Sequence, residues 1–399
     1  MQFIDLKVQY QRLKPAIEAR FAEVMRHGVF IMGPEIAELE EKLAQICGAK
    51  HAISCASGTD ALLMPLLAWG IGPGDAVFTT PFTFYATAEV VALVGAIPVF
   101  VDIDPRTYNI CPKALERAIE AVRKQDAGIY PLPKAALEQK LTPRLVIPVD
   151  IFGQAAEYDA ILPIARQYGL KVMEDAAQSF GGTYRGKPLC GLPCEVATTS
   201  FFPAKPLGCY GDGGAMFTDD DELAHALRSL RVHGKGSDKY DNVRVGINGR
   251  MDTLQAALML PKLDIFAEEI AARQKVAAFY SERLGKIEGI TVPYVEPYNV
   301  SAWAQYTIQC DNGDNSDNSP ANARRDALAV HLKAKGIPTA VYYPKPLHMQ
   351  SVFAHLGYRP ADLPVAAKLC QRVLSLPMHP YLTEEEQARV CEAIEGFSE

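Results

Sequence analysis

The sequence has no dense block of lysine and arginine. Its 40 lysines and arginines are outnumbered by 47 aspartates and glutamates, which gives a formal net charge of −7. A nucleic-acid surface needs clustered positive side chains, so we expect no nucleic-acid partner.

Long apolar runs are also missing. A membrane-spanning helix needs about 18 or more consecutive apolar residues, and no such run occurs. Asp5 and Lys7 lie where a secretory signal has its apolar core, so we expect no such signal. We therefore predict a cytoplasmic protein with no membrane partner.

The sequence also lacks a cysteine pattern typical of disulfide-bonded proteins, and it lacks a nucleotide-binding motif. Nine cysteines are scattered over 399 residues, and an odd count in a long chain is typical of reduced thiols. Cys190 and Cys194 flank a short loop, but no second ligand pair stands out, so we predict no metal site. Neither the P-loop pattern nor GxGxxG occurs.

What the sequence does contain is a regular alternation of short apolar segments with amphipathic ones. The predicted strands are 51–55, 76–79, 97–101, 145–149, 171–174, 197–201 and 215–218. The predicted helices are 8–27, 34–47, 59–69, 84–94, 112–123, 157–168 and 220–233. Short apolar strands separated by helices predict an α/β fold with a mainly parallel sheet buried on both faces.

The pattern changes around residue 250, where a long helix is expected over 253–284. The remainder predicts strands 305–310 and 339–343 with helices 321–335, 362–371 and 383–397. We expect a large domain over 1–255 and a smaller α/β domain over 256–399. Residues 123–143 read as an inserted surface excursion, and 311–322 as a polar loop.

Several strands end in chemically useful groups, and ligands of such sheets bind beyond the carboxyl ends of the strands. Gly58 and Thr59 follow the first strand and open a helix, which suits a phosphate, although an N-cap alone would explain them. Phe84 follows the second strand and could stack on a flat ring or belong to the core.

Asp175 and Gln178 follow the strand over 171–174. A carboxylate at a buried strand end is costly unless a cation or metal pairs with it, and a protonated ring nitrogen is one such partner. Gln178 can face the same space. The alternative is an aspartate that caps the following turn.

Lys205 lies in the stretch 199–214, TSFFPAKPLGCYGDGG, among aromatic residues, prolines and glycines. Desolvation lowers the pKa of a lysine, and a neutral amine can form a Schiff base. The alternative is a surface lysine in a turn. With the Ser200 hydroxyl, the strand ends supply phosphate donors, a flat aromatic ring, a buried acid and a nucleophilic lysine, the set that pyridoxal 5′-phosphate requires.

The chain resembles the sugar aminotransferases of the DegT/DnrJ/EryC1/StrS group, which have the aspartate-aminotransferase (type I) fold with a seven-stranded, mainly parallel sheet. The resemblance covers nearly the whole chain, and its motifs include GPEIAELEEKLA, CASGTDAL, PFTFYATAE, EDAAQSFG, SFFPAKPLGCYGDGGA, GINGRMDTLQAA and SLPMHPYL. Within the group, the last three are most similar to UDP-2-acetamido-2-deoxy-3-oxo-glucuronate aminotransferases, which make a 3-amino sugar acid of surface polysaccharides.

The resemblance implies pyridoxal 5′-phosphate as the cofactor and a role for each candidate residue. Lys205 would be the Schiff-base lysine and the base that shuttles a proton. Asp175 would pair with the ring nitrogen, Gln178 would lie by the ring hydroxyl, and Phe84 would stack on the ring. The phosphate would be held by Gly58, Thr59 and Ser200.

The resemblance also implies residues for a partner subunit and for the substrate. Asn248 would reach the phosphate of the neighbouring subunit's cofactor, which makes a homodimer with shared active sites the functional unit. Arg250 would meet a substrate carboxylate, or alternatively pair with a nearby acid. Tyr343 and His348 are further candidates for sugar contacts, although His348 could equally be structural. Asp150 stands where many relatives carry a histidine, so its role is open.

The implied reaction transfers an amino group from L-glutamate to a nucleotide-linked keto sugar, with ping-pong kinetics. Alternatives are a 4-keto or 3-keto 6-deoxy sugar as substrate, a pyridoxal-phosphate-dependent sugar dehydratase, or a non-catalytic regulatory protein. The dehydratase alternative is opposed by Lys205, which those relatives replace with histidine.

Overall fold

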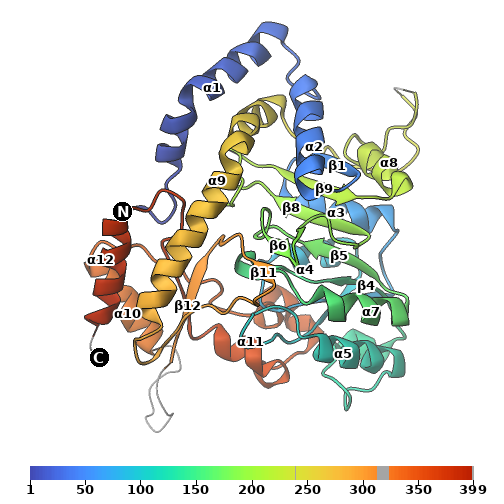
Figure 1. Cartoon of the computed structure of the whole chain (residues 1–399). Helices are drawn as coiled ribbons and strands as arrows, with labels where there is room; N and C mark the ends of the chain where they lie inside the picture. The colour runs from blue at the N-terminus through green and yellow to red at the C-terminus, as the bar shows by residue number, and fades with distance from the viewer. Residues whose placement is uncertain (239, 312–322, 398–399) are drawn as a thin grey trace.

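The computed structural model describes residues 1–238, 240–311 and 323–397, and a seven-stranded sheet forms its centre (Figure 1). The order across the sheet is β1-β9-β8-β5-β4-β2-β3. The strands are β1 (His51–Cys55), β2 (Asp75–Thr79), β3 (Ile97–Phe100), β4 (Thr142–Ile147), β5 (Lys171–Asp175), β8 (Val196–Ser200) and β9 (Gly214–Thr218). All neighbours are parallel except that β9 is antiparallel to both β1 and β8. The predicted mainly parallel α/β sheet is confirmed.

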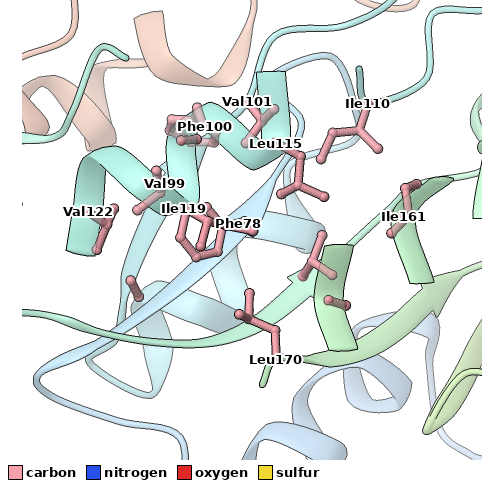
Figure 2. Close-up of a cluster of buried hydrophobic side chains, with 14 of the residues drawn as sticks. Phe78, Val99, Phe100, Val101, Ile110, Leu115, Ile119, Val122, Ile161 and Leu170 are labelled. Carbon is pink, nitrogen blue, oxygen red and sulfur yellow. The ribbon is translucent and has the colours of Figure 1, made fainter. Parts of the chain in front are cut away.

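Both faces of the sheet are covered by helices, because successive side chains of a strand point to opposite faces. In β2, Val77 belongs to one core with side chains of α3 (Gly58–Ala68), α4 (Ala86–Leu93) and α8 (Asp221–Leu230). Phe78 belongs to another, with α5 (Pro112–Lys124) and α7 (Tyr158–Tyr168). Figure 2 shows this second core, where Phe78 lies near Ile119 of α5. Continuously apolar strands are what such double coverage requires.

Residues 123–143 were expected to be a surface excursion, but part of this segment packs into the core around Phe78. Tyr130 and Leu132 are buried there, as is Ala136 of α6 (Lys134–Glu138). The hydroxyl of Tyr130 also accepts a 2.7 Å hydrogen bond from the Asp102 N–H at the end of β3. The insertion therefore covers one face of the sheet.

A second, three-stranded sheet organises the C-terminal part. It is formed by β10 (Ile290–Thr291), β12 (Tyr306–Cys310) and β13 (Val373–Leu376). Its core includes residues of α9 (Thr253–Leu284), α10 (Ala323–Ala334) and α12 (Glu384–Glu395). The first half of α9 contributes instead to a core against the large sheet. Since one helix serves both cores, the domain boundary after residue 255 stays a prediction.

The remaining elements are short or peripheral. The arm helix α1 (Leu6–His27) lies along α9, and α2 (Pro34–Cys47) leads into β1 (Figure 1). The others are β6 (Thr183–Tyr184), β7 (Lys187–Pro188), β11 (Asn299–Val300), α11 (Pro364–Leu369), η1 (Ile151–Gly153), η2 (Leu347–Met349), η3 (Ser351–Leu356) and η4 (Pro360–Asp362). No helix within the described ranges is long and apolar enough to cross a membrane.

One strand prediction for the C-terminal part was wrong. The strand expected over 339–343 is reduced to a single bridge between Ala340 and Ser375, because prolines at 338 and 344 flank it and lack the N–H that a ladder needs. The helix expected over 362–371 is confirmed but shorter: it is α11, which begins at Pro364, and the preceding Leu363 has a non-helical backbone (φ −130°, ψ 70°). The strands β10, β11 and β13 were missed. The polar loop falls, except for Asp311, outside the described residues.

Asp102 offers a test of how the C-terminal part is held to β3. Its carboxylate accepts hydrogen bonds of 2.9–3.0 Å from the N–H groups of Ile103, Val365 and Ala366. Asp102→Ala leaves these donors without a partner and should lower the free energy of unfolding by about 2 kcal/mol, measured by urea denaturation. The exposed Asp126, whose carboxylate accepts a hydrogen bond from the Gly128 N–H, is the control, and Asp126→Ala should change stability by less than about 0.5 kcal/mol. Equal losses in the two variants would contradict this account.

Candidate active site

The predicted phosphate donors meet where β1 and β8 end. Cys55 of β1 and Ser200 of β8 both pair with Gly214 of β9, so these carboxyl ends are adjacent. A Cβ atom on Gly58 would lie 2.6 Å from the Cβ of Ser200, which explains why a glycine stands there.

The N-terminus of α3 opens at this junction. Ser57 is its N-cap and accepts a 3.0 Å hydrogen bond from the N–H of Asp60. Gly58 and Thr59 are the first two helical residues, whose N–H groups have no partner inside the helix. With the Ser200 hydroxyl beside them, these groups form a place for an anion of phosphate size.

Asp175 is buried at the end of β5, on the same edge of the sheet. Its residue is only 3 % exposed, and its two carboxylate oxygens accept hydrogen bonds from the Thr87 hydroxyl (2.9 Å) and the Ala177 N–H (3.2 Å). Burial raises the pKa of this carboxyl, whereas both donors and the charge of Lys205 lower it. A buried carboxylate of this kind favours a positively charged partner.

Thr87 was missed by the sequence analysis. It lies in the first turn of α4, three residues after Phe84, and its hydroxyl also bonds that of Thr83 at 3.2 Å. The only hint in the sequence was its place just after a strand end.

Lys205 is presented by a tight turn that follows β8. Its N–H donates to the Phe202 carbonyl at 2.9 Å, and the Cys209 N–H returns to the Phe201 carbonyl at 2.7 Å. The residue keeps some exposure, but its amine is surrounded by protein, and desolvation lowers its pKa to about 8 against an opposing effect of Asp175. A proton therefore leaves this amine more easily than an ordinary lysine.

Gln178 and Tyr343 are in direct contact. The side-chain amide of Gln178 donates to the Tyr343 hydroxyl at 3.0 Å and accepts from the Phe152 N–H at 2.6 Å. The structure thus brings a residue of the C-terminal part against the turn that follows Asp175.

Asp150, whose role was open, supports that turn from behind. It is fully buried, and it accepts hydrogen bonds from the Ala156 N–H (2.8 Å), the Tyr158 hydroxyl (2.9 Å) and the Ser179 hydroxyl (3.0 Å). Burial raises its pKa. Its own N–H donates to the Asp175 carbonyl, so we assign it a structural role.

Asn248 and Arg250 lie in a neighbouring pocket of about 570 Å³, together with Ile31, Ser57 and Asp212. The Nε of Arg250 is buried without a hydrogen-bond partner, and no acid of the described chain lies within ion-pair distance of Arg250. The guanidinium is therefore available to a ligand.

The last two candidates differ in accessibility. Phe84 is 59 % exposed and offers a free ring face at the edge of the sheet. His348 lies near the carboxyl ends of β2 and β3 but is buried: it is 1 % exposed, with its ring 6.5 Å from that of Phe100 and 6.1 Å from that of Tyr358. Burial lowers its pKa to about 4, as for a neutral core histidine.

These residues fit pyridoxal 5′-phosphate as the sequence analysis expected. The anion place at Gly58, Thr59 and Ser200 suits its phosphate, the buried carboxylate of Asp175 suits a protonated ring nitrogen, and the desolvated amine of Lys205 suits its aldehyde. In the described ranges no three His, Cys, Asp or Glu side chains gather as metal ligands.

Known proteins of one family match nearly the whole chain. The profile of the DegT/DnrJ/EryC1/StrS aminotransferase family matches residues 11–395. A UDP-2-acetamido-2-deoxy-3-oxo-D-glucuronate aminotransferase of Pseudomonas aeruginosa is 51 % identical over 394 residues, or 99 % of each chain.

Two solved structures share the fold over nearly the whole chain. An aminotransferase of this family from Brucella abortus has a TM-score of 0.90 at 50 % identity, covering 100 % of this chain and 99 % of its own. NtdA from Bacillus subtilis, solved with the cofactor PMP bound, has a TM-score of 0.82 at 29 % identity and covers 98 % and 82 %.

The lowered pKa of Lys205 predicts a pH-dependent contribution to stability. Between about pH 8 and the usual lysine pKa of about 10.4, the unfolded chain binds more protons at this residue than the folded one. The free energy of unfolding of the cofactor-free wild type should therefore rise with pH relative to Lys205→Met across this window. Denaturant titrations at several pH values measure the difference. Lys275→Met, at an exposed position of α9, should give a flat difference, and a flat result for Lys205→Met would refute the assignment.

Proposed function

The chain belongs to the DegT/DnrJ/EryC1/StrS aminotransferase family, and from this we propose that it transfers the amino group of L-glutamate to the 3-keto group of UDP-2-acetamido-2-deoxy-3-oxo-glucuronate. The family's cofactor is pyridoxal 5′-phosphate, which supplies an aldehyde that exchanges amines and a ring that accepts electrons. The observation that carries the proposal is the desolvated amine of Lys205 near the buried carboxylate of Asp175.

The chain's own residues divide the work. Because the pKa of Lys205 is lowered to about 8, its Nζ gives up and takes back a proton near neutral pH, as a base at the carbon that exchanges its amino group must. Thr87 and the Ala177 N–H keep the Asp175 carboxylate oriented. The keto acid leaves before the sugar enters, so ping-pong kinetics are expected.

Arg250 favours a uronate over a neutral sugar. An arginine binds a carboxylate through two parallel hydrogen bonds, and this arginine has no acidic partner among the described residues. The relative from Pseudomonas aeruginosa is named for a glucuronate substrate. Both observations support the carboxylated sugar over the 6-deoxy alternatives.

A product assay tests the proposal. The protein with cofactor is incubated with L-glutamate and a panel of UDP- and dTDP-linked keto sugars, and mass spectrometry detects the amino sugars formed. We expect the 3-amino product of the UDP-linked uronate, and loss of at least about a hundredfold in rate for Lys205→Ala. If a 4-keto or 3-keto 6-deoxy sugar is converted faster, that sugar is the substrate instead of the uronate. A dehydrated product would indicate a sugar dehydratase. A protein that takes up no cofactor would favour a non-catalytic regulatory role.

Arg250→Lys tests whether Arg250 binds the carboxylate of the sugar or another part of the substrate. The lysine keeps the charge but cannot form the paired hydrogen bonds, so kcat/KM for the uronate should fall by about tenfold or more, while neutral keto sugars change little. Arg228→Met, at an exposed position of α8, is the control and should change neither. Equal effects of Arg250→Lys on both sugar classes would argue that Arg250 does not read the carboxylate.

The proposed active unit is a homodimer. Val29, Phe30, Ile31 and Met32 form a continuous apolar segment, each residue 40–47 % exposed, and Ile31 also lines the pocket of Asn248 and Arg250. Exposed apolar patches of this kind mark interaction surfaces. Such an interface would border the site and suits an Asn248 that serves the partner's phosphate.

Sedimentation velocity tests the dimer. Ile31→Asp should shift the protein toward the monomer and lower its activity, because a charge would be buried at the interface. Leu93→Asp, which changes an apolar residue of α4 that is 65 % exposed, is the matched control and should remain dimeric. A monomeric wild type would refute the proposal.

The proposed location is the cytoplasm. All nine cysteines are free thiols, seven of them buried, which suits a reducing compartment. Fractionation of cells would check it.

A further inference from the structure

A second lysine lies below the turn that carries Lys205. Lys262 of α9 is fully buried, although lysine is among the residue types least often buried without a partner. Its Nζ donates a 2.6 Å hydrogen bond to the carbonyl of Gly208 and lies 3.7 Å from the centroid of the Tyr210 ring.

We propose that Lys262 is a positioning residue for Lys205, which fixes the 202–209 turn by holding the carbonyl of Gly208. This inference rests on the proposed function, in which Lys205 carries the proton. No role for Lys262 in contact with the cofactor or the substrate is implied.

Two backbone hydrogen bonds close the turn itself. Its own hydrogen bonds run from Lys205 to Phe202 and from Cys209 to Phe201. At Gly208 the backbone comes so close to the start of the turn that a Cβ would lie 2.7 Å from the Pro203 carbonyl oxygen. The Gly208 carbonyl points the other way, to α9, where Lys262 is its side-chain donor.

Neighbouring residues of α9 extend the same support. The side chain of Gln255 accepts a 3.0 Å hydrogen bond from the Tyr210 N–H, and the thiol of Cys209 lies 3.2 Å from the sulfur of Met259. One helix therefore contacts three consecutive residues after the turn, 208–210, and Lys262 makes the only contact of the three that involves an ammonium group. Desolvation lowers the pKa of Lys262 to about 8, while Cys209 and Glu269 raise it.

Burial of the Lys262 ammonium group costs free energy that other contacts must offset, and the structure shows two such contacts. The hydrogen bond to Gly208 is charge-assisted, and the ring of Tyr210 attracts a cation through its face. An apolar side chain of the same length would fill the space at no such cost. The use of a lysine here is explained by the carbonyl that it holds.

Lys262→Met, which has nearly the same length and no donor, tests the proposal. Hydrogen exchange followed by mass spectrometry on the cofactor-free chain should show the amides of Lys205 and Cys209 exchanging about tenfold faster, while those of β8 are unchanged. In the complete enzyme kcat should fall about tenfold or more, with KM for both substrates within about twofold, because the amine is misplaced while the binding groups remain. Lys275→Met on the exposed face of α9 is the control and should leave both measurements unchanged.

The outcomes separate this inference from the proposed function. Unchanged exchange in the turn together with an unchanged kcat overturns the positioning role, as does faster exchange spread evenly over α9 and β8, which would mark Lys262 as merely structural. If Lys262→Met does not fold, Lys262→Gln, whose shorter side chain falls short of the carbonyl, gives the same comparison. If Lys262→Met speeds exchange in the turn but the wild-type protein aminates none of the sugars, the positioning role of Lys262 is retained and the proposed substrate is wrong.

Discussion

A carboxylate buried at the end of β5 constrains the site more than any other group. Removing a charged Asp175 from water is costly, and the structure offsets that cost with two hydrogen-bond donors and the nearby amine of Lys205. Each of these groups comes from a different element: Thr87 from α4, Ala177 from the turn after β5, Lys205 from the turn after β8. The carboxylate thus fixes how these three elements must be placed, and Asp150 holds the next turn in place behind it.

The parallel direction of the strands makes this convergence possible. Because six of the seven strands of the large sheet run the same way, residues 58, 175 and 200 leave the sheet at one edge although more than 100 positions separate the first from the second. A site assembled in this way depends on the order of strands and tolerates changes in the helices between them. The segment around Tyr130 is one such change, since it adds to the core on one face of the sheet and contains none of the candidate site residues.

The gathering of strand ends at one edge also decides which parts could be predicted from the sequence. Asp175, Ser200 and Lys205 were found because an apolar run that ends in a polar residue marks a strand end, and strand ends gather at one edge. Thr87 and Lys262 were not found, because their role depends on how each helix is rotated against its neighbours, which one sequence does not specify. The strand expected over 339–343 was wrong for a related reason, because its pairing depends on Ser375, which is distant in the chain. The burial of His348 against Phe100 was likewise not specified by the sequence, which left a sugar contact and a structural role both open.

The single reversed strand has a consequence for the lysine. Since β9 is antiparallel to β8 and adjacent to it, Ser200 and Gly214 face each other across the ladder and close the 13 residues between them into one loop. A short closed loop loses little further entropy when one of its residues is fixed, because most of its freedom was already lost when its ends paired. Lys205 therefore lies in a loop whose two ends are fixed by the pairing of β8 with β9. This pairing limits the positions that the Lys205 amine can occupy. A longer loop would displace the Lys205 amine even if every residue around that amine stayed the same.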